Sequence, residues 1–261
     1  MNAGTRSAGT GAWQAFFDEI ARWRDAGRTV EFWWRDDDAS RADPALSRLV
    51  ALSQKMSIPL ALAAIPARSE RNAFQGMGQL VSVLQHGTDH ANRAPAGEKK
   101  TEFPAAEPVP SALLRLDAAR RQLQAIAGNR FLPVLAPPWN RIADRLASQL
   151  AGAGLRGLSQ YGPRSRAESA SGLRQVNTHV DIIAWRGNRA FIGTQQALAG
   201  ATKHLAAKRM GTADSAEATG WLTHHAVHDE PAWAFLERLF ESTRGLPAVA
   251  WRRPEEIFNN S

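Results

Sequence analysis

Three consecutive carboxylates follow an apolar, aromatic run near the start of the chain and are its clearest indication of chemistry. They are Asp36, Asp37 and Asp38, and the run before them (30–34) combines bulk with β propensity, which predicts a buried strand. Three adjacent anions at a strand end repel one another by roughly a few kcal/mol at low effective dielectric. A divalent metal would offset this charge and let the carboxylates divide the roles of ligand and base. The alternative is a strand that runs out into a solvated acidic turn.

Two histidines, His86 and His90, follow a second apolar run (80–85) at a spacing of four residues. On one helical turn, side chains at this spacing share a face and can bind one metal ion. A carboxylate from another strand end would complete a set of two histidines and one aspartate that leaves positions open for water, as catalytic zinc sites do. The alternative is two unrelated surface histidines.

A third cluster lies between residues 222 and 229, where His224, His225 and His228 occur beside Asp229. His224 and His228 repeat the four-residue spacing, so a second metal pair is one interpretation. The other is that His224 titrates as a general acid while its neighbours orient it.

The elements that must position these groups alternate between strands and helices along the chain. Apolar runs predict strands at 30–34, 58–66, 80–85, 132–135, 155–159, 175–180, 220–223 and 248–251. Amphipathic spacing predicts helices at 13–26, 44–56, 113–126, 141–151, 195–209 and 231–243. Strands that are apolar throughout favour a parallel sheet covered by helices, and hence an α/β fold. In a barrel of parallel strands the active site lies at the C-terminal strand ends, where the polar clusters fall.

The chain carries no internal repeat and no low-complexity linker. This predicts one domain over residues 1–261, with a flexible N-terminus at 1–11. Residues 91–110 are polar and rich in Pro, Glu and Lys, and they predict a long loop of the kind that is often functional.

Composition excludes several classes of function. The 261 residues include no cysteine, which rules out disulfides, thiolate zinc sites and cysteine nucleophiles. Neither a secretory signal nor a membrane span is visible, so we expect a cytoplasmic protein. The net charge of +7 raises nucleic-acid binding as an alternative, but the basic residues are spread along the chain without a basic block that alternates with aromatics. We therefore expect no nucleic-acid and no membrane partner.

Taken in order, these motifs resemble those of the polysaccharide deacetylase family, also known as the nodulation-protein-B homology domain or carbohydrate esterase family four. The resemblance covers residues 28–251 and implies a distorted (β/α) barrel of about seven parallel strands. The family's first motif is an Asp-Asp pair, which implies that Asp37 is the catalytic base and Asp38 a metal ligand. Its second motif implies that His86 and His90 are the other two ligands.

The remaining three motifs match in order at 136–139, 181–185 and 222–224. The resemblance implies that His224 protonates the leaving amine and that Asp181 keeps this histidine charged and oriented. It also implies a wall that suits a sugar ring or an acetyl methyl group, formed by Pro138, Trp139 and Trp185. The alternative for the two tryptophans is a position in the core.

Two positions depart from the family pattern. Ala136 replaces the arginine that contacts the base in the family, and Arg35 or Arg141 is the candidate replacement. Ala184 replaces the second acid of the fourth motif.

The register of the acidic triplet is also open. Ala39 stands where the family usually has glycine, and a slip of one residue would give the base and ligand roles to Asp36 and Asp37. Without this shift in register, we expect Asp36, His225 and His228 to support the site from around it, without being the base or a ligand.

Two further polar residues, His179 and Asn140, are weaker candidates for function. His179 and Asn140 lie near the ends of motifs, and His204 lies on a predicted helix, where we expect it at the surface.

The activity that the resemblance implies is metal-dependent removal of an N-acetyl group from an amino sugar or a related carbohydrate. Zn²⁺ suits two histidines and an aspartate best, and Co²⁺, Ni²⁺ or Fe²⁺ also suits them. One alternative is hydrolysis of another small amide or ester at the same site. Another is a catalytically weak, carbohydrate-binding relative, in view of Ala136.

Overall fold

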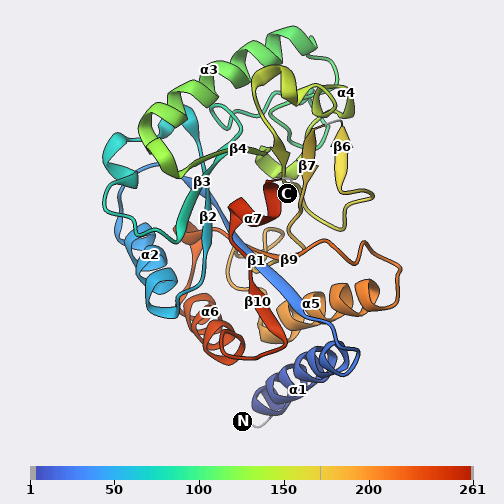
Figure 1. The fold of residues 1–261 in the computed structure, drawn as a ribbon. Helices are drawn as coiled ribbons and strands as arrows, with labels where there is room; N and C mark the ends of the chain where they lie inside the picture. Colours follow the sequence, from blue (N-terminus) through green and yellow to red (C-terminus); the bar gives the residue numbers. More distant parts are fainter. Residues whose placement is uncertain (1–3, 171, 260–261) are drawn as a thin grey trace.

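The computed structural model describes residues 4–170 and 172–259, in which helices surround a mostly parallel sheet (Figure 1). The strands are β1 (Val30–Ala39), β2 (Leu60–Ala64), β3 (Val81–His86), β4 (Phe131–Ala136), β5 (Gly157–Leu158), β6 (Glu168–Ala170), β7 (Leu173–Gln175), β8 (Val180–Asp181), β9 (Thr219–Thr223) and β10 (Val249–Trp251). They pair in the order β6-β7-β5-β4-β3-β2-β1-β9-β8, with β10 beside β1. Among these pairs only β6 and β7 run antiparallel.

Helices follow most of the strands and cover the sheet. They are α1 (Gly4–Asp25), α2 (Pro44–Met56), α3 (Val109–Ala127), α4 (Asp144–Ala147), α5 (Thr194–Arg209), α6 (Glu230–Thr243) and α7 (Pro254–Phe258). Short 3₁₀ turns are η1 (Pro66–Arg68), η2 (Arg71–Phe74), η3 (Gly128–Arg130), η4 (Pro138–Asn140), η5 (Leu150–Ala153) and η6 (His225–Val227). Local sequence fixes two helix starts, because the carboxylates of Asp43 and Asp229 accept the N–H groups of Leu46 and Ala232 at 2.8 and 2.9 Å.

Strand β1 lies at the centre of the fold, and its alternation assigns each residue to one of two faces. Phe32 and Trp34 belong to the large core between the sheet and its helices. Trp33 belongs to a separate cluster on the other face of the strand. Because side chains alternate along a strand, Arg35 and Asp37 share the side of Trp33.

One continuous segment joins the two edges of the sheet. The N–H of Val176 bonds to the carbonyl of Leu158 at 3.1 Å, beside the β5–β7 pair. Three residues later, the N–H of His179 bonds to the carbonyl of Gly220 at 2.7 Å, beside the β8–β9 pair. The chain therefore crosses from one edge to the other, which confirms the predicted α/β fold and its distorted barrel arrangement.

Buried polar side chains hold this crossing segment in place. Glu217 accepts the backbone N–H groups of Asn177 and Arg164 at 2.9 and 3.0 Å. It also lies 3.2 Å from Nε2 of His179, whose Nδ1 accepts the N–H of Gly220 at 2.9 Å. All of these side chains are buried, so each hydrogen bond offsets the cost of removing a polar group from water.

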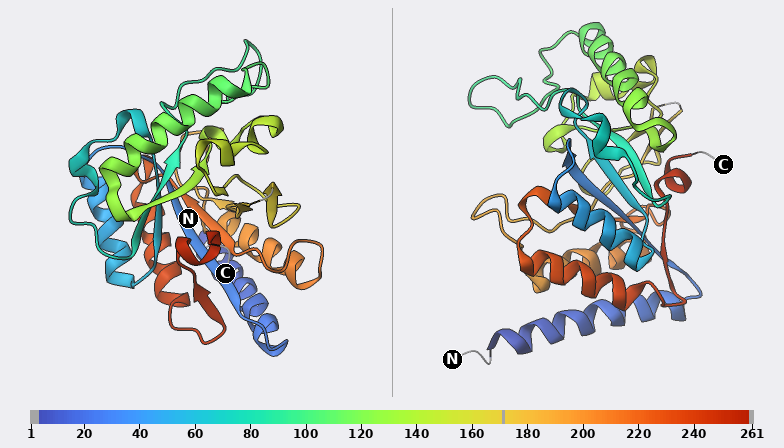
Figure 2. Two further views of the ribbon diagram at one scale, coloured as in Figure 1. Left: turned by 45° about the horizontal axis from the view of Figure 1, so that its top comes forward. Right: turned by 90° about the vertical axis from the view of Figure 1, so that its left-hand side faces the viewer.

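The two ends of the barrel differ. In the right-hand view of Figure 2 the long loop at 91–108 and the turn at 184–191 project on one side, and α7 lies on the opposite side. At that opposite end, Phe258 packs edge-on against Trp33 with ring centroids 5.7 Å apart. Within the described part of the chain, no helix is both long enough and apolar enough to cross a membrane.

Several predicted elements need correction. The helix predicted at 141–151 is divided between α4 and η5, and the strand predicted at 175–180 is divided between β7 and β8. Helix α7 has too short a pattern to be recognised. Helix α1 reaches back to Gly4, inside the stretch predicted to be flexible, whereas residues 1–3 lie outside the described residues.

The prediction that His204 lies at the surface is wrong. It is 5% exposed, stacks on His179 with ring centroids 3.5 Å apart, and its Nδ1 lies 3.0 Å from Oγ1 of Thr219. The reason is that α5 packs on β8 and β9 through a face that includes this polar side chain.

This burial predicts a pH-dependent stability. Burial lowers the pKa of His204 to about 2, so the folded protein keeps the side chain neutral where the unfolded chain takes up a proton. The unfolding free energy should therefore decrease as the pH falls below about 6.5. His204→Asn cannot titrate and should reduce this slope between about pH 6 and pH 4 by up to about 1.4 kcal/mol per pH unit. Denaturant titrations at several pH values measure it, and equal slopes in the two proteins would contradict the assignment.

Candidate metal centre and active site

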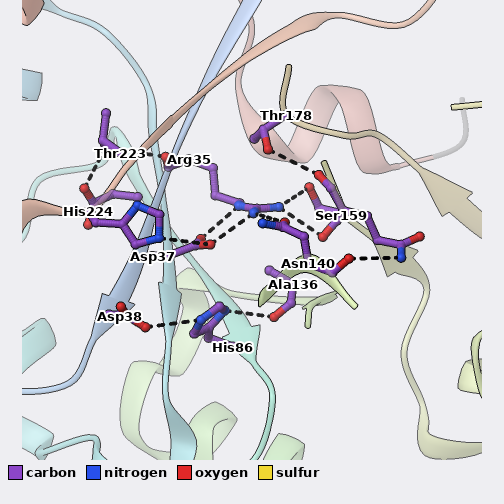
Figure 3. Close-up of polar contacts among 12 residues, drawn as sticks. Arg35, Asp37, Asp38, His86, Ala136, Asn140, Ser159, Thr178, Thr223 and His224 are labelled. Atoms are coloured by element: carbon purple, nitrogen blue, oxygen red, sulfur yellow. Dashed lines mark hydrogen bonds and ion pairs between the residues drawn. The ribbon is translucent and has the colours of Figure 1, made fainter. Parts of the chain in front are cut away.

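Asp38, His86 and His90 come together at the C-terminal ends of β1 and β3. Nε2 of His86 and Nε2 of His90 each lie 3.3 Å from Oδ1 of Asp38. Because a carbonyl can only accept, Nδ1 of His86 donates to the carbonyl of Ala136 at 2.9 Å, which turns its Nε2 toward Asp38 (Figure 3). The three candidate ligand atoms all lie within 4.8 Å of one another.

These residues fit a divalent metal ion. In a tetrahedral zinc site with ligand distances of about 2.0–2.1 Å, neighbouring ligand atoms lie about 3.3 Å apart. The two observed separations from Asp38 agree with this value. Oδ1 of Asp38 is also buried, and within the described part of the chain it has no hydrogen-bond partner, although a carboxylate oxygen in that position needs one.

The charges of the cluster favour the ligand form of the aspartate. Burial acts to raise the pKa of Asp38, but the neighbouring His86 outweighs it and holds the pKa well below its usual value. For His86, burial acts to lower the pKa, and the carboxylates of Asp37 and Asp38 raise it overall. The carboxylate is therefore ionised at neutral pH, as metal coordination requires.

Unusual backbone geometry is concentrated at this end of the barrel. Asp38, His90, Trp139 and Asn140 have φ values of 72°, 59°, 56° and 56°, in the left-handed region. Non-glycine residues in this region are uncommon and gather at functional sites, where surrounding contacts hold them. Here the unusual conformations occur at two of the candidate ligands and at a predicted substrate wall.

Asp37 lies on the inner face of β1 beside the metal cluster and is paired with Arg35. The guanidinium contacts both carboxylate oxygens, with Nε 2.9 Å from Oδ1 and Nη2 3.0 Å from Oδ2. Its other donors bond to the carbonyl and hydroxyl of Ser159 at 3.0 and 2.6 Å and to Oδ1 of Asn140 at 2.7 Å. Arg35 therefore supplies the guanidinium contact that Ala136 cannot, whereas the exposed Arg141 donates to the carbonyl of Lys100.

Asp36 faces the opposite side of β1 and has its own partners. It accepts hydrogen bonds from Oγ1 of Thr223 at 2.6 Å and the N–H of His225 at 3.0 Å, and lies 2.5 Å from Nδ1 of His225. Burial acts to raise the pKa of Asp36, but His225 lowers it overall. Burial acts to lower the pKa of His225, but Asp36 raises it overall. Asp36 is thus engaged away from the metal cluster.

The second metal pair, one of the two interpretations of the spacing of His224 and His228, finds no support in the geometry of the described residues. Nε2 of His228 accepts the backbone N–H of His224 at 3.4 Å, and within residues 4–170 and 172–259 these two histidines belong to no three-ligand group. Burial lowers the pKa of His228 to about 4, so this side chain is neutral at pH 7.

His224 lies between two carboxylates at the mouth of the barrel. Its Nε2 is 4.0 Å from Oδ2 of Asp37 (Figure 3). Its Nδ1 is 4.0 Å from Oδ1 of Asp181. Both separations exceed hydrogen-bond length, which leaves room for the ring to adjust. Burial raises the pKa of Asp181 above its ordinary value.

Two tryptophans stand beside these groups. The ring of Trp185 meets that of His224 edge-on at 4.6 Å, and its Nε1 donates to Oδ2 of Asp181 at 2.7 Å. It is 43% exposed, so it is not a core residue. Trp139 follows the buried Pro138 and packs against His90 with ring centroids 4.5 Å apart.

A second histidine-rich group has the composition of a metal site but not the geometry. His179, His204 and Glu217 offer ligand atoms within 4.8 Å of one another. The two rings, however, stack with an angle of 16° between their planes. Ring nitrogens coordinate in the plane of the imidazole, and two stacked parallel rings cannot both direct their lone pairs at one ion.

Three residues at the site have little or no signal in the sequence. Ser159 lies one residue after β5 and anchors Arg35. Thr223 lies at the end of β9 and donates a hydrogen bond to Asp36. Only these contacts in the structure reveal the two roles. Glu102 lies in the polar loop at 91–108 and contacts the turn that carries His90.

Comparisons with known proteins agree with this architecture. No protein-family model matches the chain, and no curated protein matches its sequence. A Mycobacterium smegmatis protein named as a polysaccharide deacetylase has a TM-score of 0.61 at 12% identity, covering 88% of this chain and 89% of its own. The peptidoglycan deacetylase PdaC from Bacillus subtilis has a TM-score of 0.51 at 15% identity, covering 88% and 90%. A family 4 carbohydrate esterase from Streptomyces lividans has a TM-score of 0.54 at 12% identity, covering 85% and 91%.

The fold is therefore that of the polysaccharide deacetylases of carbohydrate esterase family four, as the order of the motifs predicts.

The buried pair of Arg35 and Asp37 predicts a strong coupling. Arg35→Met leaves the carboxylate of Asp37 buried without its cation, and we expect the unfolding free energy to fall by about 3–5 kcal/mol. Adding Asp37→Asn should restore part of this loss, because no uncompensated charge then remains. Denaturant unfolding of the single and double variants measures the coupling, with the exposed Arg141→Met as the control. Purely additive effects would contradict a direct pair.

Proposed function

We propose that this protein is a metal-dependent hydrolase that removes an N-acetyl group from an amino sugar or a related carbohydrate. The observation that carries the proposal is the position of Asp37 and His224, two proton-transfer groups directly beside a three-ligand set of two histidines and an aspartate. The shared fold with family 4 carbohydrate esterases and peptidoglycan deacetylases supports the same class of reaction.

Asp38, His86 and His90 would hold the metal, which we expect to be Zn²⁺, with Co²⁺, Ni²⁺ or Fe²⁺ suiting the same ligands. When bound, the ion would polarise the acetyl carbonyl and lower the pKa of water. His86 holds the pKa of Asp38 low, which favours the ionised ligand form of this carboxylate. The hydrogen bond from Nδ1 of His86 to the carbonyl of Ala136 directs the other ring nitrogen, Nε2, toward Asp38.

Asp37 would accept the proton of the attacking water. Arg35 grips both of its oxygens, which fixes the direction of the carboxylate while each oxygen keeps a second lone pair for the incoming proton. The same guanidinium is anchored by Ser159 and Asn140, so the base has little freedom to turn away.

His224 would give a proton to the departing amine. It lies between Asp37 and Asp181, with one ring nitrogen 4.0 Å from a carboxylate oxygen of each. Trp185 restrains Asp181 through its indole N–H and packs against the histidine. A positioned acid of this kind contributes typically about a hundredfold to ten-thousandfold in rate.

The two tryptophans would bind the substrate. Trp139 packs against His90, and Trp185 packs against His224. An aromatic face suits the apolar face of a sugar ring or the acetyl methyl group. Hydrolysis of another small amide or ester would use the same groups, so it remains the alternative activity. Ala136 raised the alternative of a catalytically weak, carbohydrate-binding relative. The contact between Arg35 and Asp37 supports an active hydrolase over that alternative.

The single-domain organisation, the cytoplasmic location and the lack of a nucleic-acid or membrane partner stay predictions.

We expect single substitutions of the neighbouring carboxylates to have different effects on metal binding and on turnover. Asp37→Asn should keep bound metal and lose about a hundredfold to ten-thousandfold in turnover, because an amide cannot accept the proton of water. Asp38→Asn and His90→Ala should lose both metal and turnover, since two remaining ligands hold zinc poorly. Elemental analysis and acetate release over a panel of acetylated sugars and small amides measure the two properties.

The matched control is Asp36→Asn, since Asp36 faces the opposite side of β1. It should lower stability yet keep metal binding in the folded fraction. If Asp36→Asn instead retains metal without turnover while Asp37→Asn loses metal, the roles belong one residue earlier. If no acetylated compound is hydrolysed by the metal-loaded wild type, the proposed activity is wrong.

A further inference from the structure

The carboxylate of Glu102 contacts the turn that carries the two candidate histidine ligands. Glu102 lies in the long loop between β3 and α3, and it is 0% exposed. Its Oε1 accepts the N–H groups of Thr88 and Asp89 at 2.8 and 3.3 Å, and its Oε2 accepts the N–H of His90 at 3.2 Å. The hydroxyl of Thr88 bonds to Oε1 as well.

Three successive backbone N–H groups that converge on one anion form a concave binding site of the kind called a nest. Such a site needs left-handed backbone, and Gly87 and His90 have φ values of 63° and 59°. Gly87 has no room for a Cβ, which would collide with the carboxylate of Glu102 and the ring of Pro138. The carboxylate thus fills the inside of the turn and determines its shape.

The loop is tied to this turn by further contacts. Arg93 forms an ion pair with Asp89 at 2.7 Å and lies 3.7 Å from the carboxylate of Glu102. Arg115, on α3, donates to the carbonyl of Glu102 at 3.5 Å and to the hydroxyl of Thr88 at 3.3 Å. Loop and turn therefore form one unit.

From this geometry we propose that Glu102 is a positioning residue that holds His86 and His90 at the separation which metal binding requires. The inference rests on the proposed function, because it takes these two histidines as ligands. Without the carboxylate, the buried N–H group of Thr88 and the partly buried N–H groups of Asp89 and His90 lose their acceptor. The turn must then open to water, which moves His90 away from Asp38. Groups that orient metal ligands typically account for about tenfold to a hundredfold in metal affinity.

The test is the affinity of the metal-free protein for Zn²⁺ and Co²⁺, measured by competition with a chelator and by the visible spectrum of bound Co²⁺. Glu102→Gln replaces one acceptor oxygen by an NH₂ group that opposes the backbone N–H groups. We expect it to weaken metal binding by about tenfold to a hundredfold and to alter the Co²⁺ spectrum. The matched control is Glu98→Gln, which removes the same charge from an exposed position of the same loop and should bind like wild type.

The measurement separates positioning from a merely structural role. If Glu102→Gln lowers the melting temperature of the metal-free protein but binds metal with wild-type affinity and spectrum, the proposal is overturned. If Glu102→Gln does not fold, Glu102→Asp decides, since it keeps the charge but withdraws it by one methylene. Weaker binding by Glu102→Asp supports the proposal, and unchanged binding overturns it.

Failure of the proposed function gives a different result. A wild-type protein that binds neither metal overturns both proposals. A wild-type protein that binds metal while the two Glu102 variants bind equally well overturns only the role of Glu102.

Discussion

Mutual repulsion among three adjacent carboxylates is the constraint on which this site depends, and the fold meets it by giving each one a different partner. Asp36 turns to one face of β1 and pairs with His225, while Asp37 turns to the other face and pairs with Arg35. Asp38 is left with the two histidines at the end of β3, and its buried Oδ1 has no hydrogen-bond partner among the described residues. A divalent cation would complete the compensation at that third position, so the electrostatics of the strand lead to the same ligand set as the geometry.

The inner face of β1 also explains how Asp37 has a guanidinium partner although Ala136 stands where the resembled motif has arginine. Trp33, Arg35 and Asp37 lie at alternate positions of one strand and share a side. The guanidinium reaches the carboxylate of Asp37 from within the same strand, and Ser159, directly after β5, accepts a hydrogen bond from it. Ala136 contributes only its carbonyl, which bonds to the candidate ligand His86. Strand β1 thus supplies both the buried carboxylate and the cation that compensates its charge. A buried carboxylate needs such a partner, whichever element provides it.

Much of this could be predicted because side chains after apolar strands must meet at one end of a parallel sheet, as His86 and His224 do. The alternation of side chains along a strand also favours Arg35 over Arg141 as the partner of Asp37, because residues two apart in a strand share a face. Glu102 could not be predicted, because its partners are backbone N–H groups and its loop has no periodic pattern. The burial of His204 could not be predicted for a related reason. Small residues surround this histidine on α5, so the helix has no clear apolar stripe that would mark its buried face.

The most direct test of the central claim is an anomalous difference map recorded at the zinc absorption edge from crystals grown with zinc. We expect a peak about 2.0–2.1 Å from the carboxylate of Asp38 and from the Nε2 atoms of His86 and His90. No peak at that position, or a peak beside His179 and His204 in its place, would contradict it.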